Sequence, residues 1–255
     1  MTLRRTLMRT LMRTLTSRLR AGTIAALLLA IVPLSAAPRH ATHRRTSIAS
    51  GGVVGRPLGS RSREMTRLRA AVRKRLAESG TGTYIGEMLV ERDSALARWP
   101  NRATPLTIWI QPDSHVRGWD EGYVDEVRDA FREWDALHLP VRFAFTGDSA
   151  AADVHVSFID HFDEPISGRT RWARDEAWWI TNGDIVLALY HKGGPKLDED
   201  ALRAMALHEI GHLLGLDHTE DPSSIMAPKV RVRALSPADR ATVRLLYTLP
   251  PGGVR

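Results

Sequence analysis

The segment from His208 to His218, HEIGHLLGLDH, constrains the fold of this chain more than any other stretch. Residues four apart on an α-helix share one face, so a helix here would point His208 and His212 in the same direction. Gly215 would then end that helix, because glycine accepts the positive φ of a sharp turn. The turn would bring His218 back toward the other two histidines. The sequence therefore predicts a helix, a glycine turn and three imidazoles around one point.

Three neutral histidines and one water form an open tetrahedral zinc site, with zinc–nitrogen distances of about 2.0–2.1 Å. Glu209 follows the first histidine directly, so its carboxylate can reach a water that the zinc polarises and act as general base. A solvated helical histidine pair is the alternative to such a site. Three further features argue against that alternative: the glycine turn, the third histidine and the downstream Met226 in the segment SIMAP. We therefore predict one catalytic Zn²⁺ with the ligands His208, His212 and His218.

Apolar and β-branched periodicity elsewhere predicts one sheet backed by helices. The expected strands lie at 105–110, 141–145, 154–158 and 184–190, and the expected helices at 123–137, 202–214 and 238–247. Ser236 and Pro237 are suited to the N-cap and first position of the last helix.

The motif HEIGHLLGLDHT with a methionine in a downstream turn resembles the metzincin zinc peptidases, and most closely the matrixins of the bacterial type. Thr219, Met226-Ala227-Pro228 and the run from Leu235 to Tyr247 carry the same resemblance, which covers roughly residues 98–249. It implies an α/β (α+β) fold: a five-stranded, mixed, mostly parallel twisted sheet with backing helices, an active-site helix, a Met-turn and a C-terminal helix. The implied activity is zinc-dependent hydrolysis of peptide bonds.

The resemblance also implies a substrate site. Peptide would lie antiparallel along an edge strand near 168–174. Ala204, four residues before the first histidine, would form the floor of the S1′ pocket, with Pro228 and Val230 in its wall. Met226 would support the metal site from below without binding the metal.

Two features depart from the matrixin pattern. The chain has no cysteine, so latency through a pro-domain cysteine is excluded. Val186 stands where a histidine ligand of a structural zinc would be expected, which predicts that this second zinc is lost. The acidic turns at 163–168 and 198–200 are either solvated or bind a Ca²⁺ ion.

The basic charge of the chain is confined to its N-terminal segment. The formal net charge is +7, but residues 1–63 contain 12 Arg and no Asp, Glu or Lys, which leaves 24 basic and 29 acidic residues in the rest. This distribution argues against a nucleic-acid-binding body. Arg-rich residues 1–20, an apolar run at 21–33 and small residues at 34–37 are typical of a secretory signal. The alternatives are an uncleaved membrane anchor and a mitochondrial transit peptide.

The expected organisation is a signal peptide or anchor at 1–37, a linker or pro-segment with one amphipathic helix at 38–97, and a zinc peptidase domain at 98–255. Met65, Leu68, Val72 and Leu76 define that helix, which could cover the mature domain. We expect a secreted or periplasmic monomer that acts on proteins or peptides, with no nucleic-acid partner and membrane contact only if the signal is uncleaved. The alternative function is a catalytically silent metal-binding or adhesive extracellular module on the same fold. A second alternative is an Arg-rich nucleic-acid or membrane-surface binder, which would depend on residues 1–63.

Overall fold

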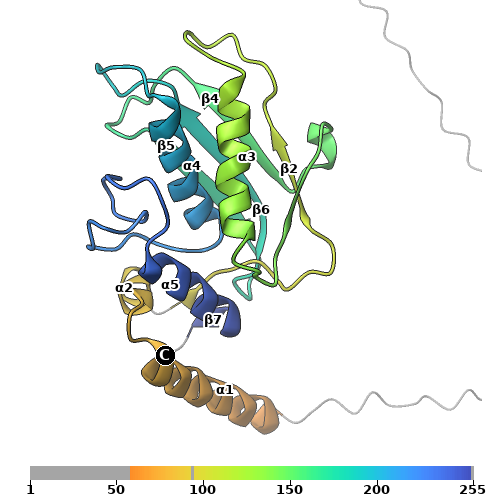
Figure 1. The fold of residues 1–255 in the computed structure, drawn as a ribbon. Helices are drawn as coiled ribbons and strands as arrows, with labels where there is room; N and C mark the ends of the chain where they lie inside the picture. Colours follow the sequence, from red (N-terminus) through yellow and green to blue (C-terminus); the bar gives the residue numbers. More distant parts are fainter. Residues whose placement is uncertain (1–57, 93–94, 254–255) are drawn as a thin grey trace, which may run out of the picture. The chain divides into compact units, whose positions relative to one another are not determined.

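The computed structural model describes residues 58–92 and 95–253 of the chain (Figure 1). The expected signal segment and the first part of the expected linker lie outside the described residues. None of the described helices combines the length and apolar character needed to cross a bilayer.

The centre of the molecule is a five-stranded sheet with the order β3-β2-β4-β6-β5. Strands β3, β2, β4 and β6 pair in parallel, and β5 pairs antiparallel with β6 and forms one edge. The expected mixed, mostly parallel sheet is therefore confirmed. The strands are β2 (Leu106–Ile110), β3 (Phe143–Phe145), β4 (Val154–Ile159), β5 (Gly168–Arg174) and β6 (Ile180–Ala188).

Two helices, α3 (Gly122–Asp135) and α4 (Glu199–Leu213), run side by side across the sheet (Figure 1). Helix α3 buries one apolar stripe that includes Val127, Phe131 and Trp134, whereas its charged residues are half-buried or exposed. Helix α4 is buried along most of its length, because α3 covers one side and β5 and β6 cover another. The element that carries the histidine pair is thus held on several sides.

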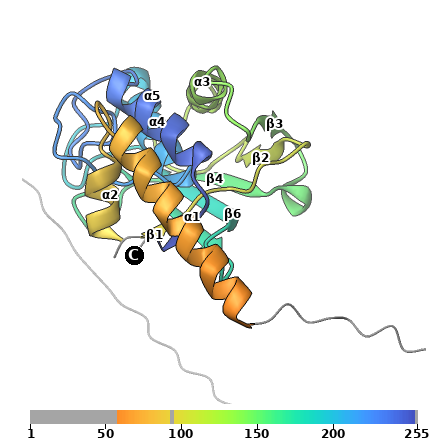
Figure 2. The same cartoon turned by 90° about the horizontal axis from the view of Figure 1, so that it is seen from below.

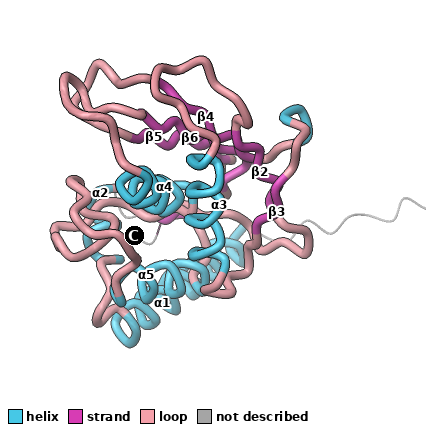
Figure 3. Tube along the Cα trace, turned by 45° about the horizontal axis from the view of Figure 1, so that its top comes forward, coloured by secondary structure: helices cyan, strands magenta, loops and turns pink. Residues whose placement is uncertain are grey.

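A long loop leads from α4 to the last helix, α5 (Pro237–Thr248), as Figure 3 shows in pink. Helix α5 begins with the expected cap: the Ser236 side chain accepts a hydrogen bond from Asp239 N, and the Asp239 side chain accepts one from Ser236 N. The short 3₁₀ turn η1 (Ser149–Ala151) precedes β4.

The segment before the sheet folds into α1 (Leu58–Ser79), α2 (Ile85–Glu91) and β1 (Ala95–Leu96). The expected helix around Val72 is present as α1, and Val72 is buried while Met65 and Leu68 remain exposed. Figure 2 shows helix α1 from below, in orange. Residues of α1, the segment 176–179 and residues 250–253 line a hollow of about 400 Å³. Strand β1 pairs antiparallel with β7 (Gly252–Gly253). The sequence patterns predicted neither α2 nor the β1–β7 pair.

Candidate active site

The three predicted histidines meet at one point at the end of α4. The Nε2 atoms of His208 and His212 are 3.1 Å apart, those of His212 and His218 are 3.2 Å apart, and those of His218 and His208 are 3.3 Å apart. Tetrahedral ligands at 2.0–2.1 Å from a zinc ion are separated by about 3.3 Å. The triangle of nitrogens therefore fits Zn²⁺. Within the described residues it is the one group of three or more His, Asp or Glu side chains arranged for a metal.

Backbone carbonyls fix the orientation of two imidazoles. His208 Nδ1 lies 2.7 Å from Ile225 O, and His212 Nδ1 lies 3.1 Å from Leu216 O. A carbonyl only accepts hydrogen bonds, so each Nδ1 carries the proton and each Nε2 offers its lone pair to the metal. Burial lowers the pKa of His208 to about 4 and also lowers the pKa values of His212 and His218. All three rings are therefore neutral near pH 7, as metal ligands must be.

Glu209 lies in the same cleft with only 3% of its surface exposed. The Thr170 hydroxyl is 2.6 Å from Glu209 Oε2, which fixes the direction of the carboxylate. A Cβ at Gly168 would overlap the Glu209 side chain, so β5 needs a glycine at that position. Burial raises the pKa of Glu209 to about 7. A carboxylate with a pKa near the working pH is suited to accept and return a proton.

Met226 is fully buried in the turn that follows the third histidine. Its sulfur packs against Gly211, where any Cβ would overlap it. Asp239 holds this turn: it accepts hydrogen bonds from the Ser224 hydroxyl (2.5 Å) and from Ile225 N (3.0 Å). Because Ile225 O in turn accepts from His208, helix α5 is linked to a metal ligand through two hydrogen bonds.

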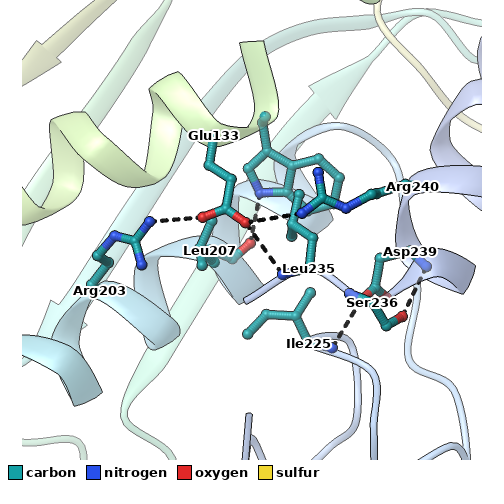
Figure 4. A network of polar contacts seen from close by, with 9 residues as sticks. Glu133, Arg203, Leu207, Ile225, Leu235, Ser236, Asp239 and Arg240 are labelled. Carbon is teal, nitrogen blue, oxygen red and sulfur yellow. Dashed lines mark hydrogen bonds and ion pairs between the residues drawn. The ribbon is translucent and has the colours of Figure 1, made fainter. Parts of the chain in front are cut away.

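Figure 4 shows the polar network that joins these elements. Glu133 on α3 forms an ion pair with Arg203 on α4 (2.7 Å) and a longer one with Arg240 on α5 (3.5 Å). It also accepts a hydrogen bond from Leu235 N, at the end of the loop that leads to α5. One carboxylate thus connects the three helices around the site.

A cleft of about 790 Å³ runs between β5 and the loop after the Met-turn. The histidines, Glu209, Pro228 and Val230 line this cleft, and so do residues 168–172 of the edge strand. Ala204 is fully buried in the core and does not line the cleft; Met205 does. The assignment of Ala204 to a pocket floor therefore stays a prediction.

Several cleft residues had no signal in the sequence. Arg92, Ser167 and His191 line the cleft, and the Ser167 hydroxyl is 2.7 Å from His191 Nδ1. His191 belongs to no metal motif, and Arg92 belongs to a segment that was expected to be a linker. Their positions follow from tertiary packing. Helical or strand periodicity could not have identified them.

Comparison with known proteins finds one family model and several metalloproteinases that match this chain. The family model described as Matrixin matches residues 98–248. Metalloendoproteinase 1 of Glycine max is 27% identical over 176 residues, covering 61% of this chain and 54% of that protein. Matrix metalloproteinase-16 of Homo sapiens is 35% identical over 135 residues, covering 51% of this chain and 18% of that protein. The chain thus spans about half of the first relative and less than a fifth of the second.

Proposed function

Because the chain belongs to the matrixin family of metallopeptidases, we propose that it is a zinc-dependent endopeptidase with His208, His212 and His218 as metal ligands and Glu209 as general base. The observation that carries the proposal is the triangle of Nε2 atoms, 3.1–3.3 Å on each side, beside a buried carboxylate in an open cleft. Metal binding alone does not require that carboxylate. Its presence favours catalysis over a silent metal-binding or adhesive module.

When bound, the zinc supplies a Lewis acid that polarises the scissile carbonyl and the attacking water. The chain's own groups move the proton. Glu209 accepts it from the water during attack and returns it to the leaving amine. The Thr170 hydroxyl keeps the Glu209 carboxylate turned toward the cleft, and His208 and His212 are held by carbonyls. Little side-chain reorganisation is then needed during the reaction.

The substrate would be an extended peptide bound along β5. This strand is the edge of the sheet and lines the cleft, so its free backbone groups can pair with a peptide in antiparallel orientation. The side chain after the scissile bond would enter the region walled by Pro228 and Val230. Apolar residues there favour an apolar side chain.

Export, a monomeric state and a bacterial origin are part of the same proposal. The Arg-rich, apolar and small-residue order of residues 1–37 supports secretion. Residues 98–255 would act as the peptidase domain after the segment 38–97, whose described part contains α1, α2 and β1. A 255-residue exported chain without cysteine is compatible with a bacterial source, although the relatives named above come from a plant and an animal. Ca²⁺ is proposed only as an alternative at the acidic turns 163–168 and 198–200. In the second of these turns, Asp198 caps α4 by accepting a hydrogen bond from Ala201 N.

The proposal is tested by casein cleavage and zinc content in two kinds of variant. Glu209→Ala should keep about one zinc per chain and lose about 10²–10⁴-fold in kcat, because only proton transfer is removed. His218→Ala should lose zinc and activity together. Wild-type turnover in Glu209→Ala would disprove the role of the carboxylate, and a wild-type chain that binds zinc without cleaving any peptide would favour the silent module.

A further inference from the structure

The segment before the family match reaches into the active site through one side chain. Arg92, at the C-terminal end of α2, lies six residues before the first residue that the family model matches. Its side chain is only 15% exposed and lines the cleft. A guanidinium that is largely removed from water requires several acceptors around it.

Those acceptors all belong to the turn between the second and third histidines. Arg92 Nε lies 2.5 Å from Asp217 Oδ2, Nη1 donates to Gly215 O at 2.9 Å, and Nη2 donates to Leu216 O at 3.1 Å. Two of these are carbonyls just past the end of α4, which no helical N–H can satisfy. The planar fork of arginine can serve three acceptors at once, whereas a lysine ammonium cannot match that geometry.

The same turn determines the position of the metal ligands. Leu216 O accepts hydrogen bonds both from Arg92 and from His212 Nδ1. Gly215 has a φ of +100°, and a Cβ there would overlap Ala97 O, so the turn packs tightly against the same preceding segment. The chain reaches His218 one residue after Asp217. Any change in the turn therefore moves one ligand directly and releases the orientation of another.

We propose that Arg92 is a positioning residue of the metal centre, which holds the 215–217 turn in the shape that brings His218 to His208 and His212. The inference rests on the proposed function, because it takes the three histidines as zinc ligands. It also implies that the mature enzyme retains α2: a pro-segment that ended at residue 97 would remove the clamp on its own active site.

The test measures the zinc dissociation constant of the full chain by competition with a chromogenic chelator, together with the thermal midpoint of the metal-free protein. Arg92→Met keeps the apolar stem and removes every donor. Loss of groups that orient metal ligands typically weakens metal binding about 10- to 100-fold, and we expect that range here. Arg92→Lys should restore part of the affinity, since it keeps the charge opposite Asp217.

Arg98→Met is the matched control. Arg98 is also buried and donates to two backbone carbonyls, Leu249 O and Trp99 O, but it does not line the cleft. We expect this variant to lower the thermal midpoint without changing the zinc dissociation constant by more than about twofold. Equal zinc affinity in Arg92→Met and Arg98→Met would overturn the proposal, because Arg92 would then be merely structural.

Two further variants, Asp217→Asn and His218→Ala, distinguish a failure of the role of Arg92 from a failure of the ligand assignment. If Arg92→Met does not fold, Arg92→Lys and Asp217→Asn decide the question: both should weaken zinc binding, and unchanged affinity in both would overturn the proposal. Wild-type zinc affinity in His218→Ala would contradict the ligand assignment itself. Normal zinc binding by the wild type, lost in His218→Ala and unaffected by Arg92 variants, would refute only the role of Arg92.

Discussion

At the scale of single residues, the site depends on small side chains as much as on the histidines. Gly168 leaves room for the Glu209 carboxylate, and Gly211 leaves room for the Met226 sulfur. Neither glycine is itself a chemical group of the site. Gly168 allows β5 to approach the Glu209 carboxylate closely, and Gly211 allows α4 to approach the Met226 sulfur closely.

Met226→Leu tests whether the Met-turn acts through packing. Methionine and leucine have similar volumes, so the substitution should cost less than about 1.5 kcal/mol in the free energy of unfolding and leave most activity. Chemical denaturation and casein cleavage measure the two effects. Zinc content should stay at about one per chain; a variant that folds normally but loses its zinc would mean that Met226 is a ligand.

The S1′ assignment is tested by a peptide library. If Pro228 and Val230 form an apolar wall, leucine after the scissile bond should exceed alanine by about tenfold or more in kcat/KM, since each buried CH₂ contributes about 0.8 kcal/mol. Ala204→Arg should penalise phenylalanine more than alanine at that subsite if Ala204 lies under its floor. A preference for acidic residues or glycine would refute the pocket assignment and leave the metal chemistry unaffected.

At the scale of elements, hydrogen bonds join the start of the short helix α2 to the last helix, α5. Tyr84, just before α2, donates its hydroxyl to Asp239 Oδ1 at 3.1 Å, and its backbone N–H donates to the Thr242 side chain. Both partners lie on α5. Burial, and then the nearby Asp239 carboxylate, raise the pKa of Tyr84 well above its usual range, so the phenol remains a proton donor.

Tyr84→Phe measures this connection. Removing a buried hydroxyl that donates to a carboxylate should lower the free energy of unfolding by about 1.5–3 kcal/mol. The half-buried Tyr190, whose ring lies beneath the Arg117 guanidinium, provides the control, and Tyr190→Phe should change stability by about 0.5 kcal/mol or less. Urea denaturation of the full chain gives both values. Equal effects of the two substitutions would show that α2 is not energetically coupled to α5.

The sequence predicted the parts of the structure that depend on local pattern. The helix 202–214, the histidine pair, the glycine turn and the C-terminal cap are all encoded within a few residues, and the structure contains each of them. Family resemblance, and not periodicity, pointed to the edge strand β5, because GRTRWAR alternates no apolar face. The roles of Arg92 and Met205 could not be predicted from the sequence. Arg92 pairs with Asp217, which is 125 positions away in the chain. Met205 lines the cleft and Ala204 does not, because tertiary packing determines which face of α4 points to the cleft.

At the scale of the whole molecule, the sheet, α3 and α5 act together as a frame for α4. Glu133 and Asp239 are the carboxylates that connect this frame to the helix and to the Met-turn (Figure 4). We therefore predict a rigid, preformed site in which the three histidines converge before any metal binds. Metal binding should then reconstitute the enzyme without refolding.

Zinc titration of the chelator-treated, metal-free protein tests whether the site is preformed and whether zinc restores activity. The metal-free full chain should be folded by circular dichroism and inactive on casein, and activity should rise linearly with added Zn²⁺ to a break at about one equivalent. The same titration of Glu209→Ala should show the same binding break with almost no cleavage. Full activity in the metal-free protein, or metal binding at one equivalent that restores no cleavage to the wild type, would contradict the account.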